Sequence, residues 1–245
     1  MIAGLGGDDI IYGTAGDDVI CGGDGDDTIW GDDGTDVIYG NAGNDRLYGQ
    51  AHFDTIYGGG GRDLLDPGEG AWSRLYGQGG RDRIVLRQFT VGDDHLVDGG
   101  PGRDTLDLGF VAPQGSHWVI VALAPGSGEG TLAAGASIFG SPTVGSVKAI
   151  ERVYGHPGND YLGGADYPVV FRGLGGDDRL EGSDGDDRLF GNAGADDISG
   201  GKGDDHIVGG VGDDNLYGGD GTDHIDGGPG GDYCLYGEWY KSCQW

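Results

Sequence analysis

A nine-residue period constrains this chain more than any other feature of its sequence. Cutting the chain every nine residues from Gly4 gives the consecutive frames GLGGDDIIY, GTAGDDVIC, GGDGDDTIW, GDDGTDVIY, GNAGNDRLY, GQAHFDTIY and GGGGRDLLD. The same cut from Gly173 gives GLGGDDRLE, GSDGDDRLF, GNAGADDIS, GGKGDDHIV, GGVGDDNLY, GGDGTDHID and GGPGGDYCL. Repetition at a short fixed period predicts a stack of similar structural units.

Each position of the frame has a predictable role. In all of these frames position one is Gly, position six is Asp, and position eight is Ile or Leu except at Cys234. Positions seven to nine form a short strand whose middle side chain points opposite to its neighbours, so Ile29 points inward and Thr28 and Trp30 point outward. Positions one to six must reverse the chain, and Gly at positions one, two and four supplies positive φ angles and close backbone approach.

Two frames make one coil of 18 residues, and successive coils are expected to stack as parallel strands ~4.8 Å apart. Residues 18 apart then become neighbours, so Asp9 lies over Asp27 and Asp27 over Asp45. Stacked carboxylates repel, unless a hard divalent cation lies between them with backbone carbonyls completing its oxygen shell. Calcium suits such a shell better than magnesium, and zinc is disfavoured because position six offers no thiolate or imidazole.

The sequence therefore predicts calcium ions, on the order of ten, held by the position-six aspartates. The predicted ligands are Asp9, Asp18, Asp27, Asp36, Asp45, Asp54, Asp63, Asp82, Asp94, Asp104, Asp160, Asp178, Asp187, Asp196, Asp205, Asp214, Asp223 and Asp232. Ser73 and Val169 stand at position six of two irregular frames, which are predicted to lack that ligand. The alternative is a set of solvated Asp–Gly turns without metal, and the extra Asp at position five is left outside the ligand set.

These frames resemble the RTX, or hemolysin-type, calcium-binding repeat found in the C-terminal parts of secreted bacterial toxins, serralysin-like proteases and alginate epimerases. The resemblance implies an all-β fold, a right-handed parallel β-roll or β-solenoid. It also implies that the chain folds and becomes rigid when it binds calcium.

The period divides the chain into four parts. Residues 1–107 form a first repeat block, irregular after residue 66, and residues 155–235 form a second. Residues 108–154 lack the period and are expected to be a β-rich spacer with a strand over 117–123. Residues 236–245 are expected to cap the last coil. Met1–Ala3 fit positions seven to nine, so we expect the chain to begin within a repeat.

The three cysteines are an odd set without the spacing of a zinc site or a redox pair. Cys234 and Cys243 are close enough in sequence to form a local disulfide that pins the cap, with free thiols as the alternative. Cys21 is left without a role.

Charge and motifs exclude several function classes. The chain has 42 acidic and 14 basic residues and a net charge of −28, so nucleic acid and anionic membranes are poor partners. No stretch is apolar enough for a transmembrane helix, and no zinc-protease, nucleophile-elbow or phosphate-loop motif is present. We therefore expect a non-enzymatic, monomeric calcium-binding module of a secreted bacterial protein, located outside the cell. The alternatives are an accessory part of a larger secreted protease, lipase or epimerase with an upstream domain, and a calcium-rigidified adhesin or surface spacer with a glycan or cell-surface partner.

Two outward-facing patterns could carry a further function. His206 and His224 share position seven 18 residues apart, which predicts a stacked pair that is either a transition-metal site or two solvated histidines. Tyr12, Trp30 and Tyr48 share position nine, which predicts an aromatic ladder that either stacks on sugar rings or packs between strands.

Overall fold

The computed structural model describes residues 1–69, 72–87, 95–108, 119–123, 129–134, 143–148 and 150–243, with the side chains of 119–123, 129–134, 143–148 and 164–165 left aside. The chain divides into two compact units: unit 1 comprises Met1–Gln114 and Pro142–Ile150, and unit 2 comprises Gly115–Ser141 and Glu151–Trp245. All regular structure in the described ranges is β-strand. No described segment is a helix able to cross a membrane.

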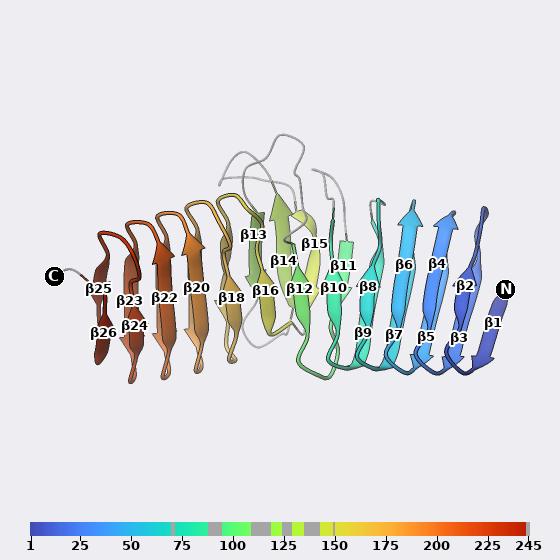
Figure 1. The fold of residues 1–245 in the computed structure, drawn as a ribbon, viewed down its shortest axis with the longest axis horizontal. Helices are drawn as coiled ribbons and strands as arrows, with labels where there is room; N and C mark the ends of the chain where they lie inside the picture. Colours follow the sequence, from blue (N-terminus) through green and yellow to red (C-terminus); the bar gives the residue numbers. More distant parts are fainter. Residues whose placement is uncertain are drawn as a thin grey trace. The chain divides into compact units, whose positions relative to one another are not determined.

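Unit 1 contains two sheets whose strands alternate along the chain (Figure 1). The first has the order β1 (Ile2–Gly6), β3 (Val19–Asp24), β5 (Val37–Ala42), β7 (Thr55–Gly61), β9 (Arg74–Gly80), β11 (His95–Asp98) and β15 (Thr143–Lys148). The second has the order β2 (Ile10–Tyr12), β4 (Thr28–Asp33), β6 (Arg46–Ala51), β8 (Leu64–Asp66), β10 (Arg83–Val85) and β12 (Thr105–Asp107). From β1 to β12 each strand thus pairs with the strand one coil away, as a solenoid requires, whereas β15 comes from a distant part of the chain to pair with β11.

Unit 2 repeats this arrangement. One sheet has the order β14 (Glu129–Ala134), β13 (Val119–Leu123), β17 (Tyr161–Ala165), β19 (Arg179–Asp184), β21 (Asp197–Lys202), β23 (Asn215–Asp220) and β25 (Tyr233–Leu235). The other has the order β16 (Arg152–Tyr154), β18 (Val170–Arg172), β20 (Arg188–Ala193), β22 (His206–Val211), β24 (His224–Asp226) and β26 (Trp239–Lys241). The fold predicted from the period, an all-β parallel solenoid of 18-residue coils, is confirmed.

The core of each unit consists of two files of position-eight side chains, one from each sheet. In register, Ile11 lies beside Ile29 and Leu189 beside Ile207, 18 residues apart in each case. From Ile20 to Ile225 these side chains are fully buried, while their neighbours in the strand face outward. Because successive side chains of a strand point to opposite faces, one apolar residue in nine is enough to fill the interior.

The roll accommodates breaks in the period without losing its register. The residue added at Pro67 lengthens one coil to 19, so that Thr55 pairs with Arg74. The strand expected over 117–123 is present as β13 from Val119; residues 117–118 lie outside the described residues. This strand pairs antiparallel with β14 and parallel with β17, so the spacer contributes strands to a repeat sheet.

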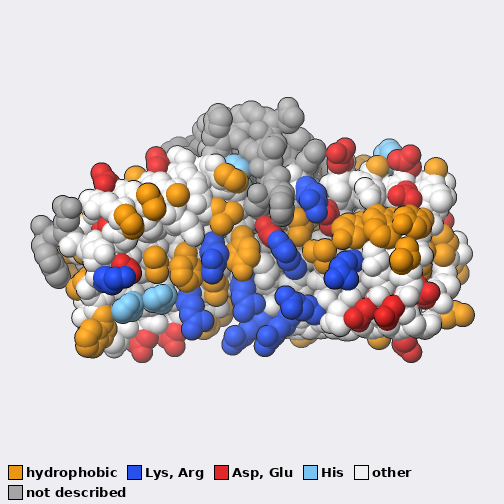
Figure 2. Space-filling model, viewed as in Figure 1, with side chains coloured by type: hydrophobic (Ala, Val, Ile, Leu, Met, Phe, Trp, Pro, Cys, Tyr) orange, Lys and Arg blue, Asp and Glu red, His pale blue; other side chains and the backbone are white. Residues whose placement is uncertain are grey.

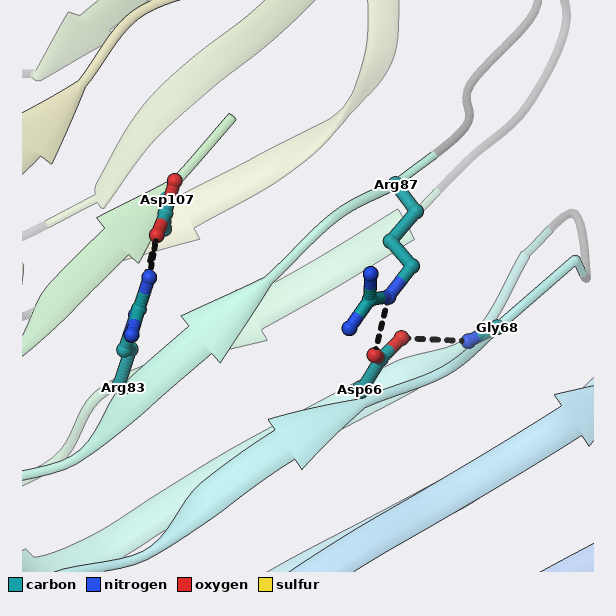
Figure 3. A network of polar contacts seen from close by, with 5 residues as sticks. All are labelled: Asp66, Gly68, Arg83, Arg87 and Asp107. Carbon is teal, nitrogen blue, oxygen red and sulfur yellow. Dashed lines mark hydrogen bonds and ion pairs between the residues drawn. The ribbon is translucent and has the colours of Figure 1, made fainter. Parts of the chain in front are cut away.

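Ion pairs replace aromatic packing on the outer face of unit 1 where the repeat becomes irregular. Asp66 occupies the position beside Tyr48 in the next coil and accepts hydrogen bonds from Arg87 and from the backbone N–H of Gly68, the latter at 3.0 Å (Figure 3). Arg83 and Asp107, on neighbouring strands, form a second ion pair in the same view. These carboxylates are nearly buried but salt-bridged, so they balance their charge without a metal ion.

The last coils of unit 2 are closed by a disulfide. Cys234 occupies the buried position-eight site of β25 and is bonded to Cys243, as predicted. Strand β26 pairs with β24, so the non-repeat residues continue the sheet for one more strand.

Candidate metal sites

The turns between strands have a fixed backbone conformation. Positions two and four are left-handed, as at Asn41 (φ 78°) and Gly43 (φ 139°) in one turn. Position one does not have a positive φ, contrary to part of the sequence expectation, and its glycine is required for another reason. A Cβ on Gly58 would lie only 2.6 Å from Oδ2 of Asp63 and 2.6 Å from the carbonyl oxygen of Gly77 in the next coil.

One oxygen of each position-six carboxylate ties its coil to the preceding one. Oδ1 of Asp27 accepts the backbone N–H of Asp9 at 2.9 Å, and Oδ1 of Asp45 accepts that of Asp27 at 2.8 Å. The same bond recurs through both units at 2.8–3.1 Å. The structure thus brings the predicted aspartates together in two rows, with each carboxylate against the backbone of its predecessor.

The second oxygen of these carboxylates has no protein partner. Within the described part of the chain, the buried Oδ2 atoms that accept no hydrogen bond belong to Asp9, Asp27, Asp36, Asp45, Asp54, Asp63, Asp82, Asp178, Asp187, Asp196, Asp205, Asp214, Asp223 and Asp232. A buried, unsatisfied carboxylate oxygen is costly, and a recurring one calls for a cation or a proton.

Oxygens of consecutive coils converge beside the position-one glycine. Oδ2 of Asp63 and the carbonyl oxygen of Gly77, in the following coil, both lie close to the point that a Cβ on Gly58 would occupy. Beside Gly209, Oδ2 of Asp214 and the Gly227 carbonyl oxygen are arranged in the same way. Carboxylate and backbone carbonyl oxygens are the ligands that calcium prefers. No cluster of three or more His, Cys, Asp or Glu side chains that could hold a metal ion is found among the described residues, so a site here would have to include backbone carbonyl oxygens.

Burial of the carboxylates raises their pKa well above the usual range. It raises the pKa of Asp54 to about 7 and of Asp178 to about 8, an effect that the backbone N–H from the preceding coil partly offsets. The carboxylates of Asp36 and Asp160, respectively, push these pKa values further up. Burial in the metal-free turn therefore disfavours the anion, and a divalent cation would offset that cost.

Position five forms a second ladder that the sequence analysis left without a role. Oδ1 of Asp26 accepts the backbone N–H of Asn44 in the next coil at 2.7 Å, in the direction opposite to the position-six bond. Among the described residues, the acids that make this bond are Asp8, Asp17, Asp26, Asp177, Asp186, Asp204 and Asp213, with distances of 2.7–3.0 Å. These carboxylates are exposed, and their function here is to bond the backbone.

The rows are interrupted where the sequence lacks the aspartate. Ser73 replaces the carboxylate with its hydroxyl, which accepts the Asp54 N–H at 3.3 Å, and Val169 contributes only its backbone N–H to Asp187 at 2.8 Å. Asp104 continues the row beyond Asp82 across 22 residues of sequence. Among the other predicted ligands, Asp18 donates its N–H to Asp36, and Asp94 lies outside the described residues.

The end of unit 2 contains a carboxylate that sequence reasoning missed. Oε2 of Glu238 accepts the backbone N–H of Asp223 at 2.7 Å, in the place where the next position-six aspartate would act. The carbonyl oxygen of Tyr236 likewise lies beside Gly218, where a position-one carbonyl would be. Glu238 follows Asp223 by 15 residues rather than 18, so the period gave no indication of it.

The outward ladders exist as predicted, and their geometry favours packing. Tyr12, Trp30 and Tyr48 stack at centroid distances of 4.8 and 5.4 Å. Figure 2 shows a stripe of hydrophobic side chains over β2, β4 and β6, the strands that contain these residues. Both faces of Trp30 are covered by its neighbours, so they are closed to a sugar ring. His206 and His224 stack at 5.2 Å with an interplanar angle of 19°.

Comparison with known proteins agrees with this geometry. The chain matches the family model described as "RTX calcium-binding nonapeptide repeat (4 copies)" over residues 1–29, 22–51, 39–71, 172–207 and 199–234, which together make up more than half of its length. No curated protein matches the chain, and no enzyme family is detected in it. The repeating turns, the two rows of half-satisfied aspartates and this match identify the chain as a member of the RTX calcium-binding nonapeptide repeat family, with the β-roll fold described above.

Proposed function

We propose that this chain is a secreted module whose folding is driven by calcium bound at the position-six turns. The observation that carries the proposal is the set of buried Oδ2 atoms without a protein partner, such as those of Asp63 and Asp214, which lie beside a carbonyl oxygen of the following coil. The ligands proposed are the position-six aspartates with this geometry. When bound, calcium supplies the positive charge that the buried carboxylates lack.

The protein's own residues perform the rest of the function. Oδ1 of each aspartate bonds the backbone of the preceding coil, and the position-one glycine leaves the space beside Oδ2 free of a side chain. Without metal, the repulsion between carboxylates and the backbone entropy of 59 glycines oppose folding. Binding energy that is available only in the rolled state then becomes folding energy.

The proposal is tested with a pair of neighbouring aspartates in unit 2. Asp196 is buried with an unsatisfied Oδ2, whereas Asp197 is exposed on the outer face of β21. Asp196→Asn should lower the calorimetric calcium stoichiometry by at least one ion, and Asp197→Asn should leave it unchanged. Full β structure by far-UV circular dichroism in excess EDTA would contradict the proposal.

Secretion follows from the calcium concentration at which such a module folds. Extracellular calcium modules bind with dissociation constants of roughly 10⁻⁴–10⁻³ M, so the chain would remain unfolded at low intracellular calcium and fold after export. RTX repeats are typical of secreted bacterial proteins, which supports this location. A folding midpoint at micromolar free calcium would argue against it.

A further inference from the structure

The turn that begins the second repeat block differs from the other turns in how its carboxylate is satisfied. The backbone N–H of His156 donates to Oδ2 of Asp160 at 2.7 Å, and Nδ1 of the same residue lies 2.8 Å from Oδ1. Both residues are buried, with 5% and 4% of their surface exposed. The oxygen that is unsatisfied in the other turns therefore already has a donor here.

The backbone explains where this donor comes from. Position two is left-handed in the turns that follow, as at Leu174 (φ 82°), Ser183 (φ 85°) and Asn192 (φ 79°). His156 stands at the same position and is not among the described residues with a positive φ. The change of φ turns the peptide between positions one and two, so that its N–H faces the carboxylate, and inward-facing N–H groups favour an anion over a cation.

Pro157 accounts for the change of backbone. A residue with a Cβ that precedes proline is restricted to extended conformations, because the proline ring collides with its backbone and Cβ. Glycine escapes this restriction: Gly228, which precedes Pro229, has a φ of 92°. In the turn of Asn192, position three is occupied by Ala193, which imposes no such restriction. The dipeptide His156–Pro157 thus both excludes the left-handed conformation and supplies the imidazole.

The space around Oδ2 that the position-one glycine and the carbonyl oxygen of the next coil enclose, here called the cradle, is otherwise unchanged. A Cβ on Gly155 would collide with Oδ2 of Asp160 and lie 2.8 Å from the Gly173 carbonyl oxygen, as the position-one glycines do elsewhere. Asp160 also donates its N–H to Oδ1 of Asp178 at 2.8 Å, so it remains in its row. The turn has the same shape as the others but a different partner for its carboxylate.

We propose that His156 closes this turn to calcium by occupying both oxygens of Asp160 with its own donors. The second block then starts from a turn that needs no ion, and Asp160 is a structural acceptor rather than a metal ligand. This inference rests on the proposed function, because it assumes that the remaining position-six turns bind calcium.

Calcium stoichiometry, measured by calorimetry on the full chain, tests the inference. Asp160→Asn should bind as many ions as the parent protein, whereas Asp196→Asn should lose at least one. Loss of an ion in Asp160→Asn would overturn the inference, and an unchanged count in Asp196→Asn would overturn the proposed function itself. The two failures are therefore distinguishable.

A gain-of-site variant covers the case in which Asp160→Asn does not fold. The double variant His156→Asn with Pro157→Ala transplants the residues of Asn192 and Ala193 into this turn. It should bind one ion more than the parent protein, because position two can become left-handed, which turns its backbone N–H away from Oδ2 of Asp160, and Oδ1 loses the imidazole. A folded double variant that binds the parental number of ions would overturn the inference.

Discussion

The cradle beside the position-one glycines makes a prediction that one methyl group can test. Gly58 and Gly60 lie in the same turn, two residues apart. A Cβ on Gly58 would be 2.6 Å from Oδ2 of Asp63, whereas a Cβ on Gly60 would have its nearest neighbour, the carbonyl oxygen of Asn41, at 3.9 Å. Gly60 also pairs in register with Ala42, so alanine already occupies the equivalent place one coil earlier.

The expected energies follow from this geometry. Forcing a methyl group into the Gly58 cradle costs ~1–3 kcal/mol of overpacking. Excluding one ion costs a further ~2.7 kcal/mol when free calcium is about 100 times its Kd. Gly60→Ala should instead stabilise the protein by ~0.4–1 kcal/mol, since it restricts the unfolded chain at an unstrained position. The two variants should therefore differ in unfolding free energy by roughly 4–7 kcal/mol at saturating calcium.

Urea unfolding followed by circular dichroism at several calcium concentrations separates the two contributions. The steric cost is independent of calcium, but the lost ion makes the difference between Gly58→Ala and Gly60→Ala grow by ~1.4 kcal/mol for each tenfold rise in free calcium. A difference that stays constant with calcium would mean that no ion is held beside Gly58. Equal stability of the two variants would show in addition that a methyl group at Gly58 meets no steric obstacle.

Three further predictions follow from the core, the carboxylates and the turns. Ile20→Ala should cost ~2–5 kcal/mol of unfolding free energy, because the Ile20 side chain is fully buried. The control Val19→Ala, at the exposed neighbouring position, should change the unfolding free energy by no more than ~0.5 kcal/mol in the same urea experiment. In EDTA, β structure measured by circular dichroism should increase as pH falls. Burial raises the pKa of Asp45 to about 6 and of Asp178 to about 8, above the 3.8 of the unfolded chain, so the folded state binds more protons and loses stability as pH rises through these values. A metal-free signal that does not change over this pH range would contradict the prediction. Thr14→Gly should leave stability unchanged or raise it by up to ~1 kcal/mol, because a β-branched residue is strained at φ 74°, and a clear loss in thermal unfolding would disagree.

The period was sufficient to predict the fold because each of its positions has a separate physical role. One apolar residue at position eight, as at Ile29, defines the interior, and an 18-residue coil sets which residues pair. Asp27 could be identified as a candidate ligand from its repetition alone. The single residue inserted at Pro67 shifted the pairing but left the aspartate row in place, with Asp63 bonded to Asp82.

The features that sequence reasoning missed depend on an irregular spacing, a backbone restriction or the direction of a bond, none of which the period specifies. Glu238 lies at an irregular distance from Asp223, and its longer side chain reaches an N–H that aspartate serves elsewhere. The role of His156 depends on the backbone restriction imposed by the following proline and not on its own spacing. The bonds made by position-five acids such as Asp26 run toward the next coil, a direction that a one-dimensional pattern does not contain.

The direction of the position-six bond gives the roll a polarity. Each coil presents a backbone N–H that a side-chain oxygen of the following coil satisfies, as at Asp196 and Asp214, so each coil is completed by its successor. The bond itself sets no limit on the number of coils. The backbone N–H of the last coil stays unsatisfied unless a residue outside the repeat, here called the terminator, accepts its hydrogen bond. Glu238 is that terminator for the row containing Asp223. Lengthening the module by whole coils therefore requires no new terminator, provided that the final residues stay in register with the last repeat.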